Sequence, residues 1–259
     1  MKILGITNLF PDRSRPGLAP FNRQQLNHLA GMNDLRLIVP VPWPHRLRAA
    51  LSGKKIEPPS GCQEGMTVNY PTYFYTPLVL RNLYGRFYFH SIRTLFRRVV
   101  REFSPDLVYA TWAYPDCYAA SLLARQYGLP LVSRVHGSDI NRLFRYRGRR
   151  KMILEGLNYS EAVISVSRPL KRKLVEYGVE DEKVKVVLNG IDRDLFRRSS
   201  RDEAREVTGI SAGAEVILFA GNLRKGKGAS LLVEAFRRLE RPEAQLHIIG
   251  EGPERSRLE

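Results

Sequence analysis

Short apolar segments alternate along this chain with longer amphipathic segments, and the alternation limits the folds that the chain can adopt. Each apolar segment has the length of a buried strand, and each amphipathic segment has the length of a helix that could cover it. Strands and helices in this order form parallel sheets, so the sequence predicts an α/β protein. The expected strands are residues 2–7, 35–39, 107–110, 131–135, 162–165, 184–188, 215–220 and 245–249.

A charged stretch, residues 192–206, separates the first strands from the last two. The strands before it are enough for a complete sheet, so we expect one domain over residues 1–200 and a second over residues 201–259. The second contains two strands and one clear helix, residues 229–239, which do not make a stable open sheet. We therefore expect this second domain to be incomplete in the given sequence.

The charge of the chain restricts its partners. Lys and Arg number 42 against 26 Asp and Glu, a formal net charge of +16, which favours nucleic acid, anionic lipid or phosphorylated substrates. Nucleic acid is not expected, because no module that reads it is present. The two cysteines, Cys62 and Cys117, are too few for a disulfide framework and favour a cytoplasmic protein. No apolar stretch reaches the roughly 18 residues of a membrane span, so any membrane contact should be peripheral.

Residues 85–103 predict a basic amphipathic helix. Apolar side chains recur in it at helical spacing, and four arginines supply cations: Arg93, Arg97, Arg98 and Arg101. Such a helix can lie on an anionic membrane, which would place the protein at the inner face of the plasma membrane. An ordinary core helix with one solvated face explains the same pattern.

Candidate ligand-binding residues follow two expected strands of the first domain. The first strand leads into an unusually long loop, FPDRSRPGLAPF, around Gly17, at the end of a sheet where open α/β proteins bind ligands. The strand 131–135 leads into His136, Gly137, Ser138 and Asp139. Ser138 or Asp139 can cap the next helix, and His136 lies at the strand end, where a catalytic and a structural role both fit. Ser167, after the strand 162–165, predicts a helix N-cap.

The most informative segment, residues 216–230, consists of an apolar strand, the loop GNLRKGKG and a helix. Exposed backbone N–H groups, the helix dipole and cationic side chains converge in such a loop, which predicts a phosphate site. A basic, solvated loop is the alternative. Gly221, Gly226 and Lys227 also fit the Walker A pattern of a P-loop phosphohydrolase, but Gly228 has no hydroxyl for magnesium. Gly250 and Gly252, after the last strand, partly match a dinucleotide fingerprint, whose third glycine is replaced by Arg255.

Taken in order, these segments resemble the retaining glycosyltransferases of family four. The segments are the loop around Gly17, HGSD at His136, VSRPLKRKL, VVLNGID, FAGNLRKGKG and IIGEGPE. The resemblance implies a GT-B fold, with an acceptor-side Rossmann-like domain followed by one that binds a nucleoside-diphosphate sugar. It implies that the enzyme moves a hexose from this donor to a glycan or a lipid-linked acceptor, as in cell-envelope polysaccharide synthesis.

The resemblance also assigns roles to single residues. Lys227 matches the lysine that holds the donor diphosphate, with Gly221 in the same loop. The family's arginine falls on Asn222, so Arg224 or Lys225 would replace it. His136 matches the histidine near the transferred sugar, and the turn that begins with Gly250 and Gly252 matches the segment beside the nucleoside.

Two further expectations concern activity. The family's pair of glutamates, which grips the donor, would lie beyond Glu259, so the given chain is expected to be inactive by itself. The alternatives are a non-catalytic remnant that binds a nucleotide or glycan and, less well supported, a P-loop phosphohydrolase. No metal and no other cofactor are expected, because a basic loop can stabilise the leaving diphosphate.

Overall fold

The computed structural model describes residues 1–60, 66–76, 80 and 83–259, so Cys62 lies outside the described residues. By their internal contacts these residues form two compact units, Met1–Gly190 (unit 1) and Ile191–Glu259 (unit 2). The assignment of domains to residues 1–200 and 201–259 stays a prediction. Within the expected linker, helix α8 (Arg201–Thr208) forms, with Ser200 accepting a hydrogen bond from the Glu203 N–H.

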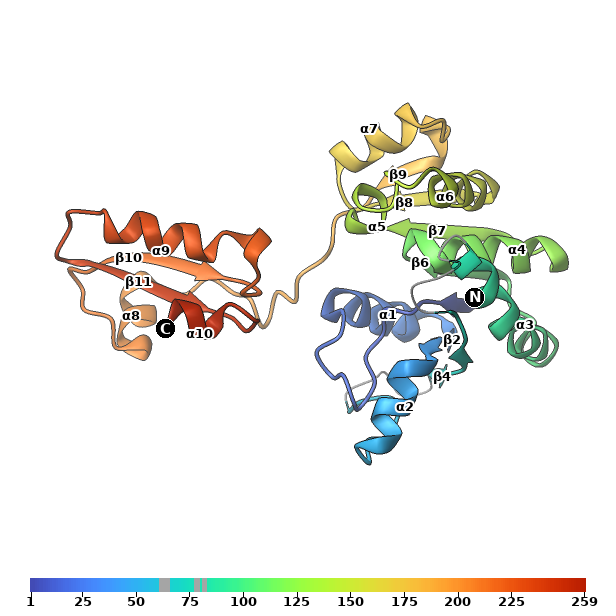
Figure 1. Cartoon of the computed structure of the whole chain (residues 1–259), viewed down its shortest axis with the longest axis horizontal. Coiled ribbons are helices and arrows are strands. Elements are labelled where there is room, and N and C mark those ends of the chain that lie inside the picture. The colour runs from blue at the N-terminus through green and yellow to red at the C-terminus, as the bar shows by residue number, and fades with distance from the viewer. Residues whose placement is uncertain (61–65, 77–79, 81–82) are drawn as a thin grey trace. The chain divides into compact units, whose positions relative to one another are not determined.

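Unit 1 contains a seven-stranded sheet in the order β4-β2-β1-β6-β7-β8-β9, and every pair in it is parallel (Figure 1). The strands are β1 (Lys2–Ile6), β2 (Asp34–Ile38), β4 (Thr67–Asn69), β6 (Leu107–Thr111), β7 (Leu131–Val135), β8 (Ala162–Ser165) and β9 (Val184–Val186). A separate pair joins β3 (Val41–Pro42) and β5 (Thr72–Tyr73). The order reverses between β1 and β6, where open α/β sheets bind ligands.

Helices cover both faces of this sheet. The helices are α1 (Pro20–Met32), α2 (Trp43–Leu51), α3 (Tyr84–Phe103), α4 (Tyr118–Tyr127), α5 (Ser138–Asn141), α6 (Arg147–Tyr159) and α7 (Arg168–Glu176). Leu26 of α1 packs on one face with Ile3 and Leu37, whereas α3, α4 and α6 pack on the other. Alternate side chains of β1 enter the two clusters, because successive residues of a strand point to opposite faces.

Unit 2 contains one parallel pair, β10 (Glu215–Ala220) and β11 (Ala244–Ile249). Its helices are α8, α9 (Ala229–Arg237) and the short α10 (Arg255–Leu258), and a single 3₁₀ turn covers Lys225–Lys227. The chain thus shows the predicted α/β class in both units.

The expected strands agree closely with the observed ones. Strands β7, β8 and β10 have the predicted bounds, and the others differ by one or two residues. The predicted cap is confirmed, since the Ser167 side chain accepts a hydrogen bond from the Leu170 N–H at 3.3 Å. No predicted range covers β3, β4 and β5, which are too short for a periodic signal, or helices α2, α4 and α6.

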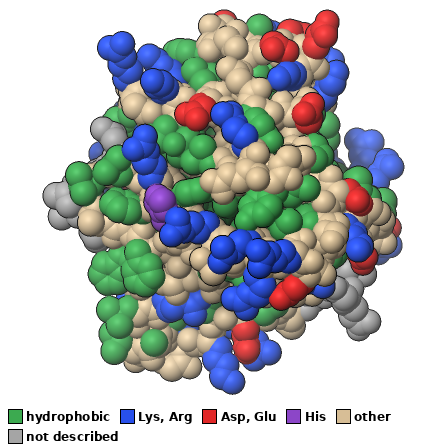
Figure 2. All heavy atoms as spheres, turned by 90° about the vertical axis from the view of Figure 1, so that its right-hand side faces the viewer, with side chains coloured by type: hydrophobic (Ala, Val, Ile, Leu, Met, Phe, Trp, Pro, Cys, Tyr) green, Lys and Arg blue, Asp and Glu red, His purple; other side chains and the backbone are tan. Residues whose placement is uncertain are grey.

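Helix α3 is an ordinary core helix on its apolar side. Ile92, Phe96, Val99 and Phe103 are buried in the main core of unit 1. The apolar face is therefore not available to enter a membrane. The four arginines named above are exposed, and Figure 2 shows basic side chains spread over the surface turned to the viewer, with fewer acidic ones between them.

Candidate functional site

A buried polar network joins the ends of β1 and β6 at the switch point of unit 1. The side-chain amide of Asn22 donates to Thr7 Oγ1 at 3.1 Å and to Thr111 Oγ1 at 3.0 Å, and Thr111 Oγ1 donates to Thr7 Oγ1 at 2.8 Å. All three residues are buried. The network ties the start of α1 to both strands and so fixes the loop that carries Gly17.

The loop around Gly17 is organised by a buried carboxylate. Asp12 accepts hydrogen bonds from the backbone N–H of Ser14 at 2.8 Å and from an Arg15 guanidinium nitrogen at 2.7 Å. Burial raises the pKa of Asp12, but the hydrogen bonds from Ser14 and Arg15 outweigh it, so that pKa is lowered overall. Gly17 itself is exposed, and nothing lies within 4 Å of the place where its Cβ would be.

His136 lies between two aromatic rings at the carboxyl end of β7. Its ring centroid is 4.9 Å from that of Phe21 and 6.1 Å from that of Trp112. Both ring nitrogens are buried, and neither has a hydrogen-bond partner among the described residues. Burial, helped by the charge of Arg134, lowers the pKa of His136 to about 4. The imidazole is therefore neutral at pH 7, and neither of its nitrogens is used in a hydrogen bond within the described structure.

Asp139 has a different role from the one that the sequence suggested. It does not cap α5. Instead, the buried carboxylate accepts hydrogen bonds from the backbone N–H of His136 at 3.1 Å and from that of Ala113 at 2.9 Å. Burial raises the pKa of Asp139. This carboxylate therefore fixes the His136 backbone and joins the segment after β7 to the segment after β6.

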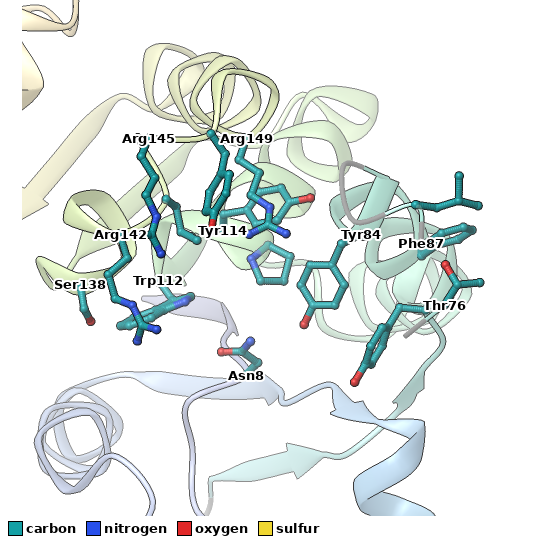
Figure 3. Close-up of a pocket in the computed structure, with 15 residues that line it drawn as sticks. Asn8, Thr76, Tyr84, Phe87, Trp112, Tyr114, Ser138, Arg142, Arg145 and Arg149 are labelled. Atoms are coloured by element: carbon teal, nitrogen blue, oxygen red, sulfur yellow. The ribbon is translucent and has the colours of Figure 1, made fainter. Parts of the chain in front are cut away.

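A pocket of about 610 Å³ opens beside these segments. Figure 3 shows Arg142, Arg145 and Arg149 on one side of it and Tyr84 and Phe87 on the other. The remaining residues that line it are Asn8, Tyr75, Thr76, Leu80, Trp112, Tyr114, Pro115, Ser138, Leu143 and Tyr146. Of the residues singled out by the sequence in unit 1, only Ser138 lines this pocket.

Most residues of this pocket were not predicted as site residues. Arg142, Arg145 and Arg149 entered the sequence analysis only through the net charge of the chain, and the aromatic residues belong to no motif. The pocket collects side chains from the ends of β1 and β6, from α3 and from the segment that joins α5 to α6. A run of arginines directly after HGSD was the available signal.

In unit 2, the predicted phosphate loop lies between β10 and α9. Asn222, Arg224, Lys225 and Lys227 are all exposed in it. Gly228 is the N-cap of α9 with φ 82°, and no side chain caps the helix. The first N–H groups of α9 therefore remain available to an anion. The left-handed backbone at Gly228 favours glycine, which explains why the hydroxyl residue of a Walker A motif is absent here.

The turn after β11 packs against this loop. The Leu223 N–H donates to Glu251 O at 2.9 Å, and the Gly221 N–H donates to Ile249 O at 2.9 Å. A Cβ at Gly250 would overlap the carbonyl oxygen of Gly221, and a Cβ at Gly252 would overlap that of Leu223. The structure thus brings Gly221, Gly250 and Gly252 together, because the carboxyl ends of parallel strands meet at one edge.

A hollow of about 370 Å³ adjoins the phosphate loop. Its lining includes the basic residues Lys225 and Arg257, the acidic residues Glu234 and Glu254, and Ser230 near the start of α9. Lys227 does not line this hollow, although it is exposed in the adjoining loop.

Among the described residues, no group of His, Cys, Asp or Glu side chains is arranged to hold a metal ion. None of the described helices has the length and apolarity needed to cross a membrane.

Comparison with known families covers both units. Residues 24–195 match the family model described as Glycosyltransferase Family 4, and residues 200–259 match that of Glycosyl transferases group 1. A relative from Bacillus subtilis (strain 168), named as a teichuronic acid biosynthesis glycosyltransferase, TuaC, is 27% identical over 267 residues, with 100% of this chain and 67% of the relative covered. The N-acetyl-alpha-D-glucosaminyl L-malate synthase of Bacillus anthracis is 25% identical over 69% of this chain and 52% of its own length.

Solved structures share the fold. Alr3699/HepE from Anabaena, crystallised in complex with UDP, superposes with a TM-score of 0.66 at 18% identity, covering 97% of this chain and 61% of its own. The sucrose-phosphate synthase of Thermosynechococcus elongatus has a TM-score of 0.64 at 16% identity, covering 98% of this chain and 63% of its own. The chain therefore has the GT-B type of α/β fold and spans roughly three fifths of these proteins.

Proposed function

The chain belongs to Glycosyltransferase Family 4. From this we propose that it takes part in transferring a hexose from a nucleoside-diphosphate sugar to a glycan or a lipid-linked acceptor. We further propose that the anomeric configuration is retained and that the product is a cell-envelope polysaccharide. The name of TuaC supports this process, and the complexes of HepE with UDP and UDP-glucose support a uridine nucleotide as the donor.

The observation that carries the proposal is the packing of the two loops in unit 2. The basic loop after β10 presents Lys227 and the uncapped start of α9, and the turn with Gly250 and Gly252 lies directly against it. Cations and backbone N–H groups suit a diphosphate. Glycine at both positions lets the turn lie this close, because a Cβ there would overlap the carbonyl oxygens of Gly221 and Leu223. We therefore assign Gly221, Asn222, Arg224, Lys227, Gly250 and Gly252 to the donor.

We assign His136 and the loop with Gly17 to the sugar and acceptor side. The support is the burial of the His136 ring between Phe21 and Trp112 with two nitrogens free of protein partners. A neutral imidazole can accept a hydrogen bond from a sugar hydroxyl, or donate one to it.

Calorimetry of the 259-residue chain with UDP, ADP and GDP, and with their glucose conjugates, tests the donor assignment. We expect one nucleoside diphosphate to bind clearly more tightly than the others. Lack of binding to every member of the panel would contradict the proposal. Release of the same nucleoside diphosphate on incubation with acceptors, by a chain extended to include the expected glutamates, would separate transfer from mere nucleotide binding.

We propose that donor binding needs no metal, since the basic loop and the start of α9 offer positive charge to the diphosphate. The affinity for the preferred nucleotide should be the same in EDTA and in magnesium. A requirement for magnesium would favour the P-loop alternative.

We also propose peripheral attachment to anionic membranes, now through charge alone, because the apolar face of α3 is buried. Each basic side chain near an anionic surface contributes about 1 kcal/mol, an effect that salt screens. Sedimentation with anionic vesicles should occur at low salt and fail at high salt. Changing Arg93, Arg97, Arg98 and Arg101 together to Gln should weaken it, and an unchanged sedimentation would contradict the assignment.

A further inference from the structure

The pocket of unit 1 combines positive charge with aromatic surface, and its lining contains no acid among the described residues. Arg142, Arg145 and Arg149 all line it, and none of them forms an ion pair in the described part of the chain. Arginines in a pocket with no carboxylate nearby favour a bound anion, because guanidinium groups match phosphate in geometry and charge.

Two of the three arginines are held by one aromatic ring, although Arg142 and Arg145 are exposed and Arg149 is half-buried. The guanidinium groups of Arg145 and Arg149 both form cation–π contacts with the Tyr146 ring, at 5.0 Å and 4.9 Å from its centroid. Nε of Arg149 is buried and has no hydrogen-bond partner in the described structure. Figure 3 shows the guanidinium groups of Arg145 and Arg149 directed from the side of α6 toward the middle of the pocket. A buried donor without a partner costs free energy unless a ligand satisfies it.

The opposite side of the pocket suits the uncharged part of the same ligand. Tyr84 and Phe87 come from α3, and Trp112 follows β6. Trp112 also stacks on His136, so the pocket lies next to the histidine assigned to the transferred sugar. Asn8 is held in the lining, since its N–H donates to the buried Asp116 carboxylate at 2.6 Å.

We infer that this pocket binds the phosphate or diphosphate group of the acceptor, with Arg142, Arg145 and Arg149 as its ligands and the aromatic side chains against the rest of the molecule. The inference rests on the proposed transferase function and adds the chemical class of the acceptor. Lipid-linked phosphates and soluble sugar phosphates both carry this group. The arginines should bind the phosphate of either acceptor. The aromatic side of the pocket should distinguish them, because it can bind the apolar chain of a lipid.

Binding of inorganic pyrophosphate, followed through tryptophan fluorescence, tests the inference. Trp112 lines the pocket, so its emission should change on binding, and the change should vanish in Trp112→Phe. Changing the three arginines together to Gln should raise the Kd by about tenfold or more, since each contact is charge-assisted. A matched control removes the same charge outside the pocket, as Arg93→Gln, Arg97→Gln and Arg98→Gln, and should leave the Kd within about twofold.

The phosphate loop of unit 2 can also bind pyrophosphate, so Lys227→Ala serves as a second control. It should leave the Trp112 signal unchanged while it weakens UDP binding. If the arginine variants bind pyrophosphate as the wild type does, or if Lys227→Ala removes the Trp112 signal, the inference is wrong. If the wild-type chain binds no nucleoside diphosphate but keeps an arginine-dependent Trp112 signal with pyrophosphate, the donor assignment alone is contradicted. Single Gln variants, checked by circular dichroism, separate a lost contact from a lost fold.

Farnesyl diphosphate and glucose 1-phosphate then identify the source of the phosphate. Tighter binding of farnesyl diphosphate than of pyrophosphate indicates a lipid-linked acceptor, and tighter binding of glucose 1-phosphate indicates a soluble sugar phosphate. Both results support the inference if they depend on the arginines. The inference is contradicted if the triple Gln variant binds farnesyl diphosphate or glucose 1-phosphate as tightly as the wild type does.

Discussion

Unit 1 and unit 2 contain the same kinds of element but bury their apolar strands to different degrees. Leu131 of β7 is 0% exposed, because neighbouring strands and helices cover both faces of the sheet. Leu218 of β10, in an equally apolar strand, is 58% exposed, and Ile249 of β11 is 62% exposed. An apolar run thus predicts a strand of a parallel sheet, but its burial depends on elements elsewhere in the chain.

The largest expected contrast between the units is in stability. Leu131→Ala should lower the free energy of unfolding of unit 1 by about 2 to 5 kcal/mol, since it leaves a cavity in a packed core. Leu218→Ala, the same change at an exposed position, should stay within about 0.5 kcal/mol. Urea unfolding followed by circular dichroism measures both. Equal losses would show that β10 is buried in solution.

Removing a positive charge from the phosphate loop of unit 2 should weaken nucleotide binding, whereas removing one from the surface of unit 1 should not. Lys227→Ala removes a charge-assisted contact to phosphate and should weaken binding of the preferred nucleoside diphosphate by about 1.5 to 3 kcal/mol, more than tenfold. Lys185→Ala, at an exposed lysine of β9, is the matched control and should have no effect. Calorimetry that finds equal affinities for both variants would remove Lys227 from the site.

A glycine in each unit tests how closely the loops are packed. Gly250→Ala should push the turn away from Gly221 and cost about 1 to 3 kcal/mol, seen as weaker nucleotide binding or lower stability of unit 2. Gly17→Ala has free space around it and should change stability by less than about 0.5 kcal/mol. A neutral Gly250→Ala variant would mean that the two loops are separated in solution.

The last expected difference is a pH dependence that belongs to unit 1. The pKa of His136 is about 4 in the folded chain and about 6.5 in an unfolded one, so the unfolded state binds more protons between these values. Stability should therefore fall as the pH drops from 6.5 to 4. The effect is limited because His136 as a residue is half-buried rather than fully buried. Urea unfolding at pH 7 and pH 5 should show a smaller fall in His136→Gln than in the wild type, and an equal fall would contradict the assignment.

Elements with a long local pattern could be predicted from the sequence, and short ones could not. Strands such as β7 and β8 were predicted with their observed bounds, because a run of apolar residues between turn residues is a local pattern. Strand β4 has three residues and pairs only with β2, so no local pattern marks it. Helix α3 was predicted as a helix, but its sequence did not decide between lipid and core, and the packing of Phe96 shows the core.

The sequence by itself determined the α/β class, the strand ends that carry His136 and the Gly-rich loop with Lys227, because these depend on residues close together in the chain. Only the tertiary structure decided what surrounds them. Phe21 and Trp112 come from distant segments and pack near His136. Arg149 and Tyr84, also distant in the chain, line one pocket that no sequence motif predicts. The physical reason is that burial, pKa and cavity shape arise from contacts between remote residues, and these form only when the sheet is assembled.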